Sequence, residues 1–208
     1  MANRLDELFA AEGSASVFAR GYSRYLSELL QALDGSAVAA VAECLLQARS
    51  HGRTVFFAGN GGSAATASHF AQDLAAVGQK AGVAGFRSLS LTDHTARLTA
   101  VANDSGYAHI FTAQMDGLFQ AGDVLVAISA SGESPNVVAA VQWAKARQGV
   151  TIGFVGFTGG TLAQCCDHVL HVRTAPGEYG PVEDVHLAVE HMITGYLALR
   201  LRQEKEAV

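Results

Sequence analysis

Apolar and polar positions follow two patterns along the chain, and their alternation predicts an α/β protein. Short runs that are mostly apolar predict buried strands, and longer segments with apolar residues every three or four positions predict helices. Strands are expected at 53–58, 86–91, 124–128, 151–157 and 168–172. Helices are expected after the first strand to about residue 77, and over 107–118, 137–148, 162–166 and 183–204. This order is typical of a doubly wound, mostly parallel sheet flanked by helices.

The first 51 residues carry no strand pattern and are predicted to be helical. Their apolar stripe has spacings of four, three and four residues and comprises Phe18, Tyr22, Tyr25 and Leu29. Gly35 and Ser36 interrupt it, and Ser36 is expected to cap a second helix from Ala37 to about His51. We interpret the chain as a single domain, 1–208, with an N-terminal helical extension (1–51) and an α/β core with the C-terminal helix (52–208).

Composition and charge exclude several classes of partner. The net charge is −5 and no basic run occurs, which argues against nucleic-acid binding. No apolar run approaches the roughly 20 residues of a membrane span, and the N-terminus lacks an apolar signal sequence. Three cysteines without a disulfide framework fit a reducing compartment, so a cytoplasmic protein is expected. Half of the residues are hydrophobic and 16% are charged, which suggests that other subunits cover part of the surface.

A glycine-rich loop follows the first predicted strand and precedes an alanine-rich helix. It reads Gly59-Asn60-Gly61-Gly62-Ser63. Glycines permit close approach of a ligand to the backbone, and the N–H groups at a helix start attract anions. The loop lacks the Gly-Lys-Ser/Thr of a nucleotide-binding P-loop. By itself it is equally consistent with a tight strand-to-helix connection.

A second polar loop follows the strand at 124–128. It places Ser129, Ser131 and Ser134 within six residues, just before a helix start. Ligands of doubly wound sheets bind beyond the carboxyl ends of the strands, where both loops are expected. Hydroxyls and free N–H groups together suit a phosphate monoester without a lysine or arginine.

Two pairs of residues have spacings that suit acid–base or metal chemistry. His69 and Asp73 are four residues apart, so both lie on one face of a helix. Glu183 and His191 are eight residues apart near the last helix, a rise of about 12 Å if the helix is straight. These two therefore cannot share an ion unless Glu183 precedes the regular helix, and otherwise they serve different sites of an oligomer.

Four motifs in combination resemble the sugar isomerase (SIS) domain. They are Gly59-Asn60-Gly61-Gly62-Ser63-Ala64, His69-Phe70-Ala71, Ala102-Asn103-Asp104 and Ser129-Ala130-Ser131-Gly132-Glu133-Ser134-Pro135-Asn136. Within that group the chain is similar to the phosphoheptose isomerases, which act on sedoheptulose 7-phosphate. The resemblance extends over nearly the whole chain. It implies an aldose–ketose isomerase that works through an enediol, and a homotetramer with active sites between subunits.

The resemblance also implies roles for individual residues. Asp73 would be the catalytic base and His191 its acid–base partner. One Zn²⁺ per subunit would be held by His69, Asp73, Glu183 and His191. The phosphosugar would be bound by Asn60, Gly61, Gly62, Ser63, Asp73, Asn103, Asp104, Ser129, Ala130, Ser131, Ser134 and Glu183.

The chain departs from the family pattern at four of these or neighbouring positions. Ala130 replaces a threonine, Asp73 a glutamate, Glu183 a glutamine, and Val77 a frequent arginine. These changes leave open the exact sugar and the epimer produced, so an isomerase of another phosphosugar is an alternative. A second alternative is a non-catalytic SIS-domain tetramer that binds a replication-initiator protein. Such relatives lack the carboxylate and the C-terminal histidine, so Asp73 and His191 favour an enzyme.

Overall fold

Five parallel strands form one sheet in the computed structural model, which describes residues 3–206. The strands are β1 (Thr54–Gly59), β2 (Arg87–Ser90), β3 (Val124–Ser129), β4 (Val150–Val155) and β5 (His168–His171). Their order across the sheet is β2-β1-β3-β4-β5. The predicted α/β fold with a parallel, doubly wound sheet is confirmed.

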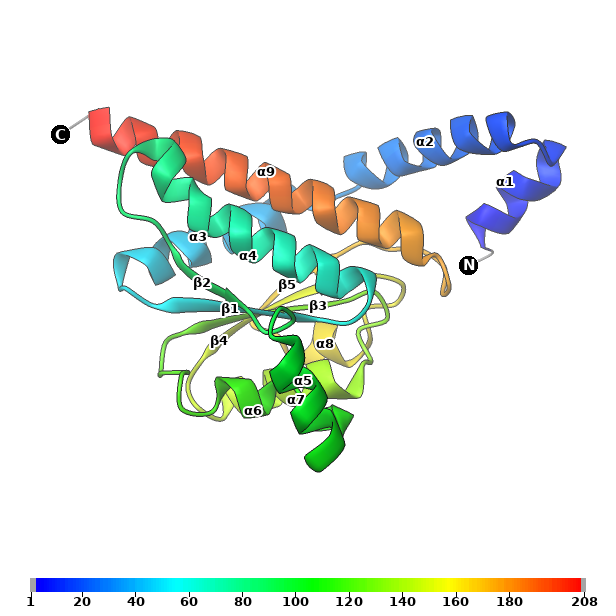
Figure 1. Cartoon of the computed structure of the whole chain (residues 1–208). Coiled ribbons are helices and arrows are strands. Elements are labelled where there is room, and N and C mark those ends of the chain that lie inside the picture. Colours follow the sequence, from blue (N-terminus) through cyan, green and yellow to red (C-terminus); the bar gives the residue numbers. More distant parts are fainter. Residues whose placement is uncertain (1–2, 207–208) are drawn as a thin grey trace.

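Helices cover both faces of this sheet (Figure 1). One face carries α3 (Gly35–Ser50), α4 (Gly62–Ala81) and α9 (Tyr179–Glu206). The other carries α5 (Thr95–Asp104), the 3₁₀ turn η1 (Tyr107–His109), α6 (Thr112–Met115), α7 (Pro135–Lys145) and α8 (Gly160–Cys165). Successive strand residues point to opposite faces, so Phe57 packs under α4 and α9 while Phe56 packs on the other side. Each face of the sheet thus has its own hydrophobic core, and these two cores hold α4 and α7 against the central strands β1 and β3.

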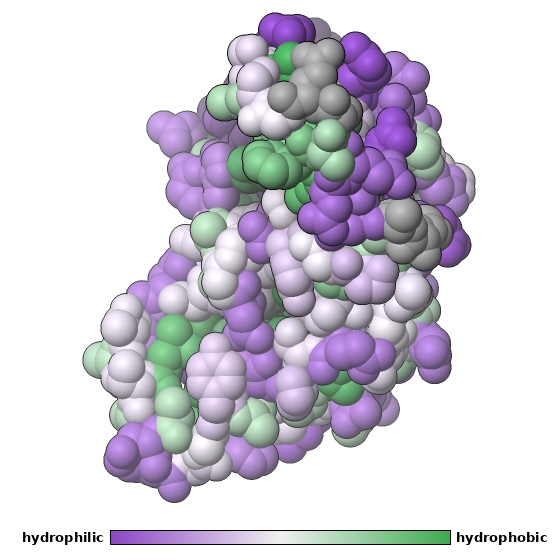
Figure 2. All heavy atoms as spheres, turned by 90° about the vertical axis from the view of Figure 1, so that its right-hand side faces the viewer, coloured by the Kyte–Doolittle hydropathy of each residue, from purple (hydrophilic) through white to green (hydrophobic). Residues whose placement is uncertain are grey.

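Two N-terminal helices, α1 (Arg4–Glu12) and α2 (Ala15–Gln31), extend beyond the body of the molecule (Figure 1). Two tyrosines of α2 tie them to the start of α9. The Tyr22 hydroxyl donates to Asp184 over 2.5 Å, and the Tyr25 hydroxyl donates to the buried Glu178 over 2.7 Å. In Figure 2, apolar side chains lie exposed in the upper part of the face at which the strands end. The N-terminal helices thus hold the first two turns of α9, which carry two residues of the site described below.

Three local predictions differ from the structure. The helix predicted over 107–118 is broken into η1 and α6, because the apolar residues Ile110, Phe111 and Met115 fold into the core from a turn. Helix α3 begins at Gly35 and is capped by Asp34, whose carboxylate accepts from the N–H of Ser36, so Ser36 is not the cap. Helix α9 begins at Tyr179, four residues earlier than expected.

No single helix among residues 3–206 is long and apolar enough to cross a membrane. Helices α2 and α3 taken as one segment would be long and apolar enough, but the chain bends by 69° between them.

His186 lies fully buried between α9 and β4 and should make the fold sensitive to acid. Its Nε2 lies 3.3 Å from the carbonyl oxygen of Val155, and its ring packs on Phe154. Burial lowers its pKa to about 4 from a usual value near 6.5, since a charged ring is poorly solvated there. Below pH 6.5 the unfolded chain binds a proton that the folded chain does not, so stability falls with pH until about pH 4.

We expect this one histidine to cost about 2 kcal/mol in the free energy of unfolding at pH 5 relative to pH 8. Urea unfolding of the native chain and of His186→Gln at both pH values measures it. The variant should lose about 2 kcal/mol less than the native chain over this interval. Equal losses in the two proteins would show that His186 does not titrate in this range.

Candidate functional site

The two polar loops meet at the centre of the sheet. Strands β1 and β3 are neighbours and pair in register, with Gly59 opposite Ile128 at their carboxyl ends. The chain leaves β1 toward one face through α4 and leaves β3 toward the other through α7. This is the point of a doubly wound sheet at which neighbouring crossovers diverge and leave a crevice for a ligand.

The glycine loop turns the chain from β1 into α4. Gly61 has φ +54° and precedes the helix without offering a side-chain cap. At Gly59, a Cβ would lie 2.5 Å from the carbonyl oxygen of Ser63, so only glycine allows this tight turn. The first N–H groups of α4 therefore remain without a side-chain cap and face the crevice.

Serine side chains line a small pocket of about 140 Å³, the serine pocket, between the two loops. The Ser129 hydroxyl lies 3.1 Å from that of Ser134 and 3.4 Å from that of Ser131. Ser134 precedes α7 without capping it, so the N–H groups of this helix start also lack a side-chain cap. The pocket is lined by Asn60, Ser63, Ile128, Ser129, Ala130, Ser131, Ser134, Tyr179 and Glu183. Two helix starts and several hydroxyls converge here, an arrangement that suits an oxyanion such as phosphate.

Glu183 brings a carboxylate to this pocket from the second turn of α9. Its carboxylate lies directly over Gly62, where any added Cβ would meet the carboxylate atoms at 2.2–2.4 Å. Burial raises the pKa of Glu183, and the neighbouring Asp184 raises it further. A carboxyl group with a raised pKa can offer a hydrogen bond to a sugar oxygen as well as accept one.

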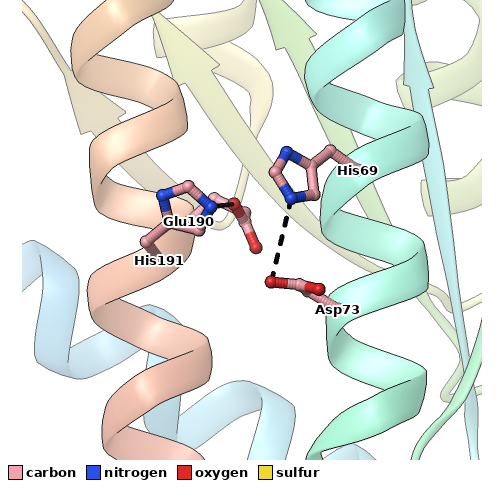
Figure 3. A group of neighbouring side chains, drawn as sticks. All are labelled: His69, Asp73, Glu190 and His191. Carbon is pink, nitrogen blue, oxygen red and sulfur yellow. Dashed lines mark ion pairs between the residues drawn. The ribbon is translucent and has the colours of Figure 1, made fainter.

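A second group of side chains, the α4–α9 cluster, lies between the two helices for which it is named. It consists of His69 and Asp73 on α4 and of Glu190 and His191 on α9 (Figure 3). One ligand atom from each residue lies within 4.8 Å of those of the other three. His69 Nε2 is 3.8 Å from Asp73 Oδ2, and the two imidazole rings are 5.0 Å apart. Two imidazoles and two carboxylates are a donor set that binds Zn²⁺ or a similar cation.

Glu190 is the buried member of this cluster. Its side chain has no exposed surface, and neither oxygen has a hydrogen-bond partner among the described residues, although His191 Nε2 lies 3.3 Å away. Burial raises the pKa of Glu190 to about 7, and the nearby His69 opposes this effect. Buried carboxylates are normally paired, so this one fits a site that a cation completes.

Most of the sequence-predicted site residues lie at these two places, and some do not. Asn60, Ser63, Ala130 and the three serines line the serine pocket, and His69, Asp73 and His191 belong to the α4–α9 cluster. Glu183 does not reach that cluster within one chain, because α9 is already helical at residue 183 and His191 follows two turns later. Asn103 and Asp104 lie exposed at the end of α5, outside the residues that line the pocket.

Sequence reasoning missed four residues of this region. Glu190 takes the place in the cluster that was expected for Glu183, and Tyr179 lines the serine pocket. The signal for Glu190 is the stripe His186, Glu190 and Thr194, which is buried on an otherwise apolar face of α9. Tyr107 and Asn136 act together on Asn60. These contacts join residues that are far apart in the chain, so the spacing of residues in the sequence does not predict them.

Asn60 is held by a small hydrogen-bond network. Its amide and that of the buried Asn136 exchange two hydrogen bonds of 2.9 Å. The Tyr107 hydroxyl donates to the same Asn60 oxygen over 3.0 Å. Within the described part of the chain, the second N–H of the Asn60 amide has no partner, and the residue lines the serine pocket. The network therefore fixes the amide so that it can donate to a ligand.

Comparison with known proteins decides which family this site belongs to. A model of the SIS domain matches residues 18–156. A phosphoheptose isomerase of Bradyrhizobium sp. (strain ORS 278) is 39% identical over 178 residues, which cover 83% of this chain and 87% of the relative. The chain belongs to the SIS-domain phosphoheptose isomerase family. A family member from Rhodospirillum rubrum is 38% identical over 161 residues, 76% of this chain and 83% of the relative.

Solved structures of the phosphoheptose isomerase family have the same fold. The structure of phosphoheptose isomerase GmhA from Neisseria gonorrhoeae matches with a TM-score of 0.76 and 33% identity, and it covers 88% of this chain and 95% of that one. A phosphoheptose isomerase from Francisella tularensis matches with a TM-score of 0.79 and 25% identity over 88% of this chain and 96% of that one. This chain is an isomerase of that family, and the serine pocket and the α4–α9 cluster are the two candidate parts of its site.

Proposed function

We propose that this isomerase interconverts sedoheptulose 7-phosphate and a D-glycero-heptose 7-phosphate through an enediol. The phosphosugar isomerase activity follows from the family, and the heptose substrate is inferred from the names of its relatives. The observation that carries the proposal is the position of both site regions along α4. Ser63, at the start of α4, lines the serine pocket, and His69 and Asp73 lie farther along the same helix.

The distance between the two regions fits a long open-chain sugar. His69 follows Ser63 by six residues, a rise of about 9 Å along α4. The six carbon–carbon bonds from C7 to C1 of a heptose span about 7.5 Å when fully extended, and the phosphate ester lengthens the molecule further. A phosphate in the serine pocket would therefore bring C1 and C2 toward the α4–α9 cluster. A three-carbon phosphosugar would fall well short of it.

Proton transfer is assigned to Asp73 and His191. In an aldose–ketose exchange a base removes the proton from C1 of the ketose, and a proton is delivered to C2. Asp73 is the proposed base, and His191, half exposed on α9, is the proposed partner that moves a proton at the sugar oxygens. The α4–α9 cluster fits Zn²⁺, which when bound would polarise those oxygens.

A second copy of the chain is proposed to cover α9 in a homotetramer. Met192, Tyr196 and Leu199 form an exposed apolar stripe on α9, about half of each side chain being accessible. The first two also line a largely apolar groove between α3 and α9. His191 lies next to this stripe, so a neighbouring copy would border the active site.

The proposal is tested by incubating metal-analysed protein with sedoheptulose 7-phosphate and identifying the product by NMR. An aldoheptose 7-phosphate supports it, and the C2 and C3 signals identify the epimer. If the protein converts only a shorter phosphosugar, the proposed substrate is wrong, but the proposed aldose–ketose isomerisation stands. Absence of any conversion by a folded protein, with retention of a replication-initiator protein on a column, would favour a binding role instead.

Tyr107→Phe tests the network that holds Asn60. Loss of one hydroxyl removes the hydrogen bond to Asn60, and a bond of this kind is worth about 0.5–1.5 kcal/mol. We expect KM to rise about twofold to tenfold, with kcat and the melting temperature unchanged because Tyr107 is 59% exposed. Ser50→Ala, which removes an exposed hydroxyl at the end of α3 just before β1, is the control. An unchanged KM in Tyr107→Phe would show that Asn60 needs no support from this residue.

A further inference from the structure

We propose that Glu190 is the fourth ligand of the cation, so that the metal site is complete within one chain and Glu183 is left to the sugar phosphate. The inference rests on the proposed function for the identity of the cation. It differs from the expectation drawn from the family likeness, in which Glu183 is the ligand. Three features of the structure carry it.

The first feature is the environment of the Glu190 carboxylate. It is completely enclosed, and neither oxygen is hydrogen-bonded within residues 3–206. Thr194, one turn further along, directs its hydroxyl to the backbone carbonyl of Glu190 and not to the carboxylate. A buried carboxylate without partners is costly, and a bound cation removes that cost by pairing both its charge and its lone pairs.

The second feature is the geometry of the four donors. Four ligands at about 2.1 Å around a tetrahedral zinc ion lie about 3.4 Å from one another. Glu190 Oε2 lies 3.3 Å from His191 Nε2, and Asp73 Oδ2 lies 3.8 Å from His69 Nε2. The four side chains point into one space between α4 and α9 (Figure 3). All four donor atoms lie within 4.8 Å of one another, which is close to the spacing that a shared ion requires.

The third feature is the position of Glu183. It precedes Glu190 by seven residues on the same regular helix, a rise of about 10 Å. Its carboxylate is already placed over Gly62 at the start of α4, inside the serine pocket. Within one chain it faces the ligand-binding loop and not the cluster.

Together these features separate two roles that the sequence pattern had joined. The cation is held by two residues of α4 and two adjacent residues of α9, so its site needs no residue from a neighbouring copy. Glu183 acts on the phosphosugar from the same face of α9, about two turns closer to the start of the helix. A substitution at 190 should therefore affect metal binding, and one at 183 should affect substrate binding.

The experiment is a competition for Zn²⁺ between the protein and a chromophoric chelator, with the native chain, Glu190→Gln and Glu183→Gln in parallel. We expect one zinc per chain in the native protein. Affinity should fall at least about 100-fold in Glu190→Gln, since loss of an outer-shell partner alone costs up to that factor. In Glu183→Gln it should stay within about threefold. Native affinity in Glu190→Gln, or an equal loss in both variants, overturns the proposal, as does a native chain that binds no zinc.

Melting temperatures of the same three proteins provide a check on folding. A ligand that binds only the folded state raises its stability, so zinc should raise the melting temperature of the native chain and of Glu183→Gln. Metal-free Glu190→Gln should melt no lower than the metal-free native chain, because a buried amide replaces a buried acid, and zinc should not raise it further. A zinc-induced rise in Glu190→Gln equal to that of the native chain contradicts the assignment. None of these readouts depends on turnover, so a failure here is distinct from failure of the isomerase assay.

Discussion

Replacing Asp73 by asparagine is expected to lower kcat about 10²- to 10⁴-fold, the contribution typical of a positioned acid or base. An amide of the same shape cannot take the proton from C1 of the sugar. Asp73 lies on α4 in a partly exposed position, 3.8 Å from His69 and 4.0 Å from Lys80, and within residues 3–206 its carboxylate makes no hydrogen bond to the core. The helix should therefore persist, and circular dichroism should be unchanged.

Two comparisons make this result specific to Asp73. Asp116→Asn changes an exposed carboxylate at the end of α6, beneath the opposite face of the sheet, and should keep the native rate. The rate of Asp73→Asn is to be measured over a range of zinc concentrations, because a loss that excess zinc restores would reflect metal binding. Full turnover in Asp73→Asn would remove Asp73 from the role of base.

Gly132→Ala is expected to cost about 3 kcal/mol or more in the free energy of unfolding and to weaken binding of the phosphosugar. Gly132 has φ +68°, which costs an alanine about 1–2 kcal/mol. A Cβ there would also lie 2.0 Å from the carbonyl oxygen of Gly159, an impossible contact with rigid backbone. The serine loop would have to move away from the turn at Gly159 and Gly160. Urea unfolding and KM for the phosphosugar measure the two effects.

Gly52→Ala is the matched control for backbone conformation. Gly52 has φ +63°, but no atom lies within 4 Å of the position of its Cβ. This variant should show only the conformational cost of about 1–2 kcal/mol, with KM unchanged. If both variants lose the same stability and Gly132→Ala keeps its KM, close packing does not hold the serine loop in place.

The strands and the two polar loops were predictable because their signals are local. Mostly apolar runs such as 124–128 identify strands that are buried on both faces, and each polar loop directly follows such a run. Parallel pairing then places the loops at one edge of the sheet without further information. For this reason the local pattern alone correctly predicts that Ser63 and Ser129 lie near each other.

The cluster between α4 and α9 was only partly predictable because its composition depends on how the two helices pack along their length. The resemblance identified His69 and His191, but it assigned Glu183 to the same ion. Residues 183 and 190 are seven positions apart on one regular helix, so both lie on the face of α9 that packs on α4. Which of them reaches His69 and Asp73 depends on how far along α9 each lies, and the sequence pattern does not give this. Glu190 lies on the buried face of α9, and a charged residue at such a position does not fit the apolar spacing from which the buried face is predicted. The break between η1 and α6 was missed for a similar reason, since tertiary packing of Phe111 and Met115 overrides local helix preference.

The most direct test of the central claim is the reaction with sedoheptulose 7-phosphate in D₂O, followed by NMR to equilibrium. Proton transfer through an enediol predicts an aldoheptose 7-phosphate that carries deuterium at C2, formed by the native chain about 10²- to 10⁴-fold faster than by Asp73→Asn. A folded, zinc-loaded protein that forms no aldoheptose would contradict the account. So would an aldoheptose that remains free of deuterium after prolonged incubation, because a hydrogen that never exchanges with solvent has not passed through Asp73 as a proton.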